Sequence, residues 1–165
     1  MSYQKGFSLV EVAVVAGIFA GAIVTMLNMY ASQTTILAES TRELQASLLL
    51  EEGVEIVRYR RDNDWATSLG AYVTGGTIYH FSYNTSIDEW QLLAGVDNTL
   101  IDDLFDRTVR FYTVQRDAST DDIVTTGGVI DPDIVRAEVT VAWFEGGATT
   151  TRVLSTYFVN VFKTS

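Results

Sequence analysis

An uninterrupted apolar stretch near the N-terminus constrains this chain more than any other feature of its sequence. No Asp, Glu, Lys or Arg occurs in residues 12–38, and residues 7–27 are apolar or small apart from Glu11 and Thr25. About 20 apolar residues suffice to cross a bilayer as a helix. A buried core helix can be equally apolar, but it would need a far larger domain around it than a chain of 165 residues provides. The stretch therefore predicts a helix embedded in a membrane.

Two other interpretations of this stretch account for less of it. A secretory signal peptide has a basic leader and an apolar region of about 7–15 residues, followed by a cleavage site. Here the leader, residues 1–6, has a single Lys, and the apolar stretch is longer and continues into a helical pattern. A plain signal anchor explains the hydrophobicity but not Glu11. A carboxylate at the bilayer centre costs about 2.5–3.5 kcal/mol, so a functional reason for Glu11 is expected.

Glu11 gains a partner if the chain is cut between Gly6 and Phe7. The cut would leave a positively charged α-amino group on Phe7, and Glu11 lies four residues further on, about one helical turn away. The carboxylate would neutralise that amine or the amine of a neighbouring subunit. Because an unpaired buried charge costs several kcal/mol, such a pair would favour one stagger between stacked subunits over others.

The residues around this position resemble a known processing signal. Residues 5–11 (KGFSLVE) resemble the class III signal of type IV pilins and of the pseudopilins of type II secretion. The shared features are a short basic leader, Gly before the cut, Phe after it, Glu at the fifth mature position and an apolar stretch that follows at once. A weaker similarity, to prepilins of the minor-pilin type, continues in residues 49–58 (LLEEGVEIVR).

The resemblance implies a structural subunit of a type IV pilus or of a type II secretion-like pseudopilus, with a minor pilin favoured. A prepilin peptidase would cut after Gly6 and methylate the amine of Phe7, and Glu11 would act in assembly through the N-terminal helix. The implied partners are other pilin or pseudopilin subunits, the peptidase, an inner-membrane assembly platform and membrane lipid. The C-terminal domain would lie outside the cytoplasm, first on a single-pass membrane protein and then in a cell-surface or periplasmic fibre.

Small residues mark one face of the apolar helix. Ala13, Gly17 and Gly21 are spaced four apart, and a small-xxx-small pattern lets helices approach closely in lipid. Because Gly and Ala are also common in membrane helices without such a role, this face is either a packing surface or ordinary membrane-helix composition.

Residues 7–61 contain no Pro, so one continuous helix of roughly 80 Å is expected at 1.5 Å per residue. Its second half keeps an amphipathic pattern. The apolar stripe comprises Leu37, Leu44, Leu48, Leu50, Val54 and Val57. The predicted organisation is a leader (1–6), a transmembrane and polymerisation helix (7–30), the amphipathic half of that helix (31–61), a linker region (62–76) and a globular domain (77–165).

Beyond residue 65 the apolar pattern changes from helical to alternating, which predicts half-buried strands. We expect strands at residues 77–83, 90–93, 108–116, 134–144 and 149–162, the last two joined by a hairpin turn at residues 145–148. In the fourth strand the residues predicted to face the core are Val135, Ala137, Val139, Val141 and Trp143. The predicted fold class is α+β, with the long helix packed on a C-terminal antiparallel β-sheet.

The composition disfavours several classes of function. The net charge of −10 repels phosphate backbones, so no nucleic-acid partner is expected. The absence of Cys excludes disulfides and thiolate metal sites. His80, the single His, has no recognisable partners for a triad or a zinc site, and a structural or exposed role is expected. We therefore expect neither enzymatic activity nor a cofactor.

Two charged clusters have simple interpretations. The acidic one comprises Asp117, Asp121, Asp122, Asp131 and Asp133. Its carboxylates are hard ligands suited to Ca²⁺, but their spacing matches no EF-hand loop, and solvated acidic loops are the favoured interpretation. The basic one comprises Arg58, Arg60 and Arg61. One interpretation is that it contacts anionic lipid or an acidic neighbour. The favoured one is that these cations complement the dipole at the C-terminus of the helix and pair with Asp62 and Asp64.

Two interpretations of the whole chain remain. One is the fibre subunit described above. The other is a single-pass, membrane-anchored extracellular domain that stays monomeric and acts in binding or adhesion. Only the first requires Glu11, because only subunits that stack through their helices place a cation beside it.

Overall fold

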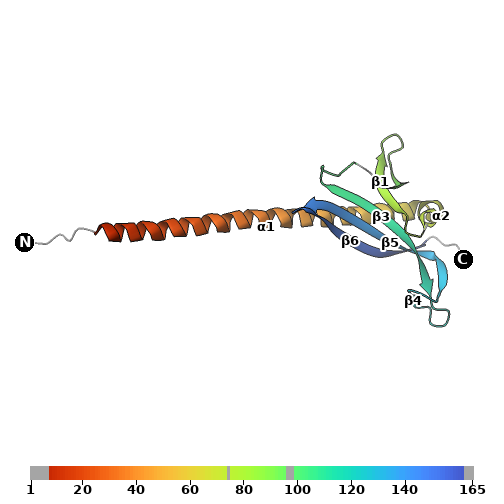
Figure 1. The fold of residues 1–165 in the computed structure, drawn as a ribbon. Helices are drawn as coiled ribbons and strands as arrows, with labels where there is room; N and C mark the ends of the chain where they lie inside the picture. Colours follow the sequence, from red (N-terminus) through yellow and green to blue (C-terminus); the bar gives the residue numbers. More distant parts are fainter. Residues whose placement is uncertain (1–7, 74, 96–98, 162–165) are drawn as a thin grey trace, which may run out of the picture. The chain divides into compact units, whose positions relative to one another are not determined.

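The structure, a computed structural model, describes residues 8–73, 75–95 and 99–161. The chain divides into two units, residues 1–44 and 45–165. Helix α1 (Leu9–Asn63) belongs to both units and is followed by an antiparallel sheet (Figure 1). The predicted α+β fold and the continuous helix are confirmed. The predicted cleavage site between Gly6 and Phe7 lies outside the described residues.

Six antiparallel strands form the sheet of the second unit. They are β1 (Ile78–Asn84), β2 (Glu89–Ala94), β3 (Phe105–Arg116), β4 (Ile123–Val124), β5 (Val129–Glu145) and β6 (Ala148–Val159). Their order is β2-β1-β3-β5-β6, with β4 paired to β3 (Figure 1). The β5–β6 hairpin turns at Gly146 and Gly147, whose φ angles are +61° and +87°. A two-residue turn with positive φ at both positions matches the twist of the flanking strands, and glycine adopts it without steric cost.

Strands β3 and β5 are longer than the alternation predicts, and β4 was not predicted. The register between β3 and β5 shifts between Thr113 and Val114, whose partners on β5 are Val135 and Asp131. Pro132, the single proline of the chain, lies in this irregularity. Proline cannot donate to a ladder, so within a sheet it is found at edges, strand starts and bulges. The register shift therefore explains how β5 accommodates it.

The segment predicted as a linker, residues 62–76, is partly helical. It contains α2 (Trp65–Ser68) and the short 3₁₀ helix η1 (Gly70–Tyr72), and Leu69 between them is fully buried. Asp64 caps α2, because one carboxylate oxygen accepts a hydrogen bond from the Ala66 amide at 3.0 Å. Leu69 therefore belongs to the core of the second unit, and Trp65, Tyr72 and Val73 pack against that core.

The core lies between the inner face of the sheet and residues 46–57 of α1. Every predicted inward position of the fourth strand is buried: Val135, Ala137, Val139, Val141 and Trp143. On α1, Leu50, Val54 and Val57 are buried as predicted. The prediction is wrong for Leu37, Leu44 and Leu48, which are between 56% and 66% exposed. Leu48 lies two residues from the buried Ala46 and Leu50, so its side chain points away from the sheet.

Gly53 allows α1 to approach the sheet closely. A Cβ atom added at this position would lie 2.7 Å from Cγ1 of Val139 on β5. Val139 is fully buried and β-branched, so it has little freedom to move aside. Only glycine fits at this contact.

Replacing Gly53 by Ala should destabilise the sheet domain. Overpacking a core costs about 1–3 kcal/mol, and the better helix propensity of Ala offsets about 1 kcal/mol of this. Chemical denaturation of the full chain in detergent, followed by tryptophan fluorescence, measures the effect. Gly17→Ala is the matched control, since a Cβ there meets no atom within 4 Å. A Gly53→Ala protein as stable as the unmodified chain would contradict the close contact.

Candidate functional site

The apolar half of α1 is exposed along its whole described length. Every described residue from Ser8 to Thr41 is exposed, including Leu9 (86%), Ile18 (68%) and Phe19 (66%). Among the described residues, α1 is the one helix long and apolar enough to cross a membrane. Contiguous apolar surface of this extent requires lipid or protein around it.

Three threonine hydroxyl groups in this part of α1 are satisfied within the helix. The Thr25 hydroxyl donates to the carbonyl of Ala22 at 2.8 Å, and those of Thr34 and Thr35 donate to the carbonyl of Ala31 at 2.8 and 3.2 Å. A polar group without a partner is costly in an apolar environment. These internal bonds make the segment compatible with lipid or a packed helical core.

Glu11 is the charged exception in the described apolar half. It lies in the first turn of α1, where the helix dipole favours an anion. Within the described residues it forms no ion pair. The next basic residue toward the C-terminus is Arg42, roughly 45 Å away along the helix. A cation for Glu11 must therefore come from the N-terminal end of the chain or from another molecule.

The predicted small-residue face is open in the structure. Ala13, Gly17 and Gly21 all lie on α1 at helical spacing, and a Cβ at either glycine would meet no atom within 4 Å. The backbone of this face is therefore accessible to a second helix. Nothing in the chain itself packs against it among the described residues.

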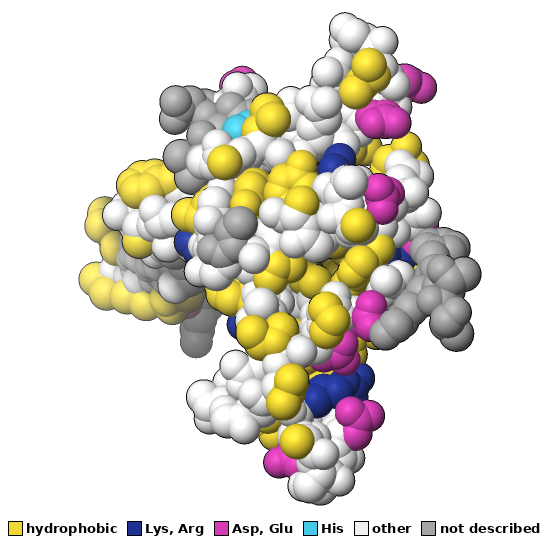
Figure 2. Space-filling model, turned by 90° about the vertical axis from the view of Figure 1, so that its right-hand side faces the viewer, with side chains coloured by type: hydrophobic (Ala, Val, Ile, Leu, Met, Phe, Trp, Pro, Cys, Tyr) yellow, Lys and Arg dark blue, Asp and Glu magenta, His cyan; other side chains and the backbone are white. Residues whose placement is uncertain are grey.

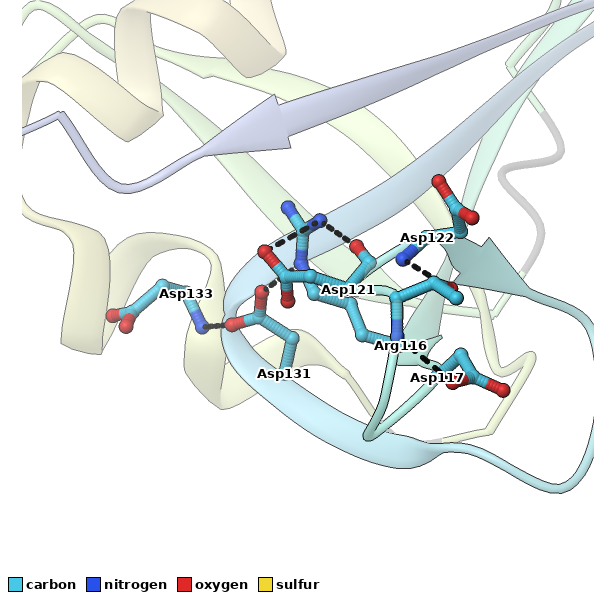
Figure 3. A network of polar contacts seen from close by, with 7 residues as sticks. Arg116, Asp117, Asp121, Asp122, Asp131 and Asp133 are labelled. Atoms are coloured by element: carbon cyan, nitrogen blue, oxygen red, sulfur yellow. Dashed lines mark hydrogen bonds and ion pairs between the residues drawn. The ribbon is translucent and has the colours of Figure 1, made fainter.

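The acidic cluster is organised by an arginine (Figure 3). Nε of Arg116, at the end of β3, lies 2.8 Å from a carboxylate oxygen of Asp131, and its Nη1 donates to the Asp121 carbonyl at 2.6 Å. Asp117 accepts hydrogen bonds from the side chain and amide of Ser119. Among the described residues, no three acidic or His side chains converge as metal ligands. The Arg116 guanidinium thus lies within ion-pair distance of two of these carboxylates, those of Asp121 and Asp131.

The basic residues at the end of α1 make three different contacts. Arg61 pairs with Asp62 at 2.7 Å, as predicted. Arg58 pairs with Glu55, three residues before it on the helix as its spacing predicts, and Nη1 of Arg60 donates to the Trp90 carbonyl at 2.7 Å. The predicted pairing with Asp64 is wrong, because that carboxylate caps α2.

Two polar side chains of the sheet have structural partners. Nδ1 of His80 lies 3.1 Å from the Gly95 carbonyl. Arg107, which sequence analysis missed, is 7% exposed on the inner face of β3. It donates to Glu52 at 2.8 Å and to the Leu49 carbonyl at 3.2 Å, and so ties the sheet to α1. Its position between the apolar residues Phe105 and Val109 was the available signal.

Comparison of the chain with protein-family models, with curated proteins and with solved structures found no match. The feature with the clearest chemical consequence is the exposed apolar half of α1 with its single carboxylate.

Hydrogen bonds lower the pKa of Asp117 below its ordinary value of 3.8, first from the Ser119 hydroxyl and then from the Ser119 and Thr120 amides. This stabilisation is present above the ordinary pKa and is lost as the pH falls through the lower folded-state value. Ser119→Ala should raise the pKa of Asp117, as measured by carboxyl NMR titration. The pKa of Asp64, lowered mainly by Thr67, should not change. An Asp117 pKa that is equal in both proteins would contradict this account.

Proposed function

We propose that this chain is a structural subunit of a fibre of the type IV pilus or type II secretion-like pseudopilus kind, and a minor pilin rather than a major one. In this proposal a prepilin peptidase cuts after Gly6 and methylates Phe7. An inner-membrane platform then assembles the mature chain with other subunits through α1. The observation that carries the proposal is Glu11, a carboxylate at the start of an exposed apolar helix.

The electrostatics of α1 support this function over a simple anchor. A carboxylate makes insertion into lipid less favourable, so an anchor would be better without Glu11. In a fibre, the amine of one Phe7 and the Glu11 carboxylate of a neighbour would be buried together. A buried charge without its partner is strongly unfavourable, so subunits would assemble in the stagger that pairs them. The open face at Gly17 and Gly21 supports close packing of helices in such an assembly.

Processing provides the first test of this function. The mature protein should begin at Phe7 with a methylated amine, because the peptidase removes residues 1–6. Removal of Lys5 lowers the number of basic residues from 11 to 10 and makes the net charge −11. Mass spectrometry of the protein extracted from membranes of peptidase-containing cells measures both the N-terminus and the methyl group. Recovery of the chain with Met1 intact would exclude this processing scheme.

Substitution of Glu11 provides the second test. Glu11→Gln should lower incorporation into fibres by at least about tenfold, because breaking a buried charge pair costs about 3–5 kcal/mol. The amount of chain in membranes should not fall, since a neutral side chain inserts more easily. Immunoblots of sheared fibres and of membranes give the two quantities.

Glu39→Gln is the matched control for this test. Glu39 is an exposed carboxylate of the same helix, and its substitution should leave incorporation unchanged. If Glu11→Gln also leaves incorporation unchanged, the fibre subunit is excluded. The single-pass, membrane-anchored binding or adhesion domain then becomes the better account of the chain.

A further inference from the structure

An aromatic groove lies between α1 and the β1–β2 hairpin in the second unit. It has a volume of about 320 Å³ and is lined by Glu52, Glu55, Ile56, Tyr59 and Trp90. The first four come from α1 and the last from β2. The groove is thus built by two elements that the sheet core holds together.

Two aromatic side chains line this groove, Tyr59 of α1 and Trp90 of β2, and Tyr83 packs against Trp90. Tyr83 and Trp90 are cross-strand partners on β1 and β2, with ring centroids 5.2 Å apart in an edge-to-face arrangement. Tyr59 and Tyr83 are each 44% exposed. Large aromatic surfaces that remain this exposed beside a groove are available to a ligand.

Trp90 is held in place from inside the domain. Its carbonyl accepts the hydrogen bond from Arg60, and the guanidinium carbon of Arg107 lies 5.9 Å from its ring centroid. The Tyr83 ring, which packs against Trp90, is held by a hydrogen bond from its hydroxyl to the Asp88 carboxylate. These contacts constrain Trp90 before a ligand binds, and such preorganisation reduces the entropic cost of binding.

The charges that line the groove are negative. Of the described residues that line it, Glu52 and Glu55 are charged, and their side chains are 49% and 63% exposed. Each accepts one ion pair, from Arg107 and Arg58 respectively. An ionised carboxylate has about four acceptor sites, so both can accept further donors from a ligand. Aromatic faces together with carboxylates attract a cation.

From this geometry we infer that the groove binds an arginine side chain of a different, basic protein. A guanidinium stacks on aromatic rings and donates to carboxylates at the same time. A second copy of this chain is a poor source, because it has 21 acidic residues against 11 basic ones. Five of its arginines already form ion pairs within the described chain: Arg58, Arg61, Arg107, Arg116 and Arg136. The identification of the partner as a neighbouring fibre subunit rests on the proposed function. The recognition of an arginine side chain by the groove does not depend on that function.

Binding is tested with the full-length chain in non-ionic detergent micelles. The indole N–H signal of Trp90, assigned by its loss in Trp90→Phe, is followed by NMR during titration with the tripeptide acetyl-Gly-Arg-Gly-amide. The signal should shift and saturate. The same peptide with citrulline, the neutral isostere of arginine, should bind at least about threefold more weakly. Equal binding of the two peptides would overturn the inference, as would the absence of any shift.

Variants locate the site on the groove. Tyr59→Ala and Glu55→Gln should each weaken arginine-peptide binding about threefold. Tyr157→Ala and Glu51→Gln are matched controls, since Tyr157 is 50% exposed on β6 and Glu51 is exposed on α1. If the controls weaken binding as much as the groove variants, the site is elsewhere and the inference fails.

A second experiment identifies the source of the cation. A photo-crosslinking amino acid replaces Tyr59 in cells that assemble the fibre, and the cross-linked peptide should come from another subunit and contain Arg. A cross-link to a second copy of this chain would overturn the choice of partner. The peptide titration does not depend on the fibre. If the peptide titration shows no binding while the chain is processed normally at Phe7, the inferred arginine site is rejected and the proposed function is unaffected.

Discussion

The contact between residues 46–57 of α1 and the inner face of the sheet is the interaction on which the rest of the structure depends. It covers the buried face of β3 and β5, and it requires Gly53 to lie directly over Val139. The same contact positions Glu52 beside Arg107 and places Tyr59 next to the β1–β2 hairpin. A helix displaced by one residue would lose the glycine contact and the charge pair together. Core packing and polar geometry thus select the same placement of α1.

Helix α1 is suited to two environments along its length. Its C-terminal part is amphipathic and is buried by the sheet on one side. Its described N-terminal part is apolar on all sides and exposed, so it depends on lipid or on other helices. Glu11 makes insertion of this part into lipid less favourable, which is the argument for the proposed assembly in which a cation becomes buried beside it. The N-terminal half is thus long and apolar enough to cross a membrane, and the C-terminal half packs against the sheet.

Charge is distributed unevenly over the domain. Two arginines of the sheet are paired inside the domain: Arg107 with Glu52 and a carbonyl, and Arg116 with Asp131 and a carbonyl. The buried Nε of Arg107 has no hydrogen-bond partner among the described residues. Hydrophobic side chains lie across the middle of one face of the molecule, and toward its lower margin basic side chains are bordered by acidic ones (Figure 2). The aromatic groove differs from both regions, because its carboxylates adjoin exposed rings.

The sequence by itself determined the features that depend on local pattern. Apolar length predicted the membrane-compatible helix, alternation predicted the inward residues of β5, and Gly146–Gly147 predicted the hairpin, because these signals reside in neighbouring residues. Only the tertiary structure decided which positions of α1 meet the sheet, which partners Arg107 finds inside, and that Arg116 pairs with Asp121 and Asp131. Those outcomes depend on side chains that lie dozens of residues apart or on opposite sides of a turn. The spacing of residues along one helix or strand does not specify which side chains another element will place against it. For this reason contacts between elements could not be predicted from the sequence pattern alone.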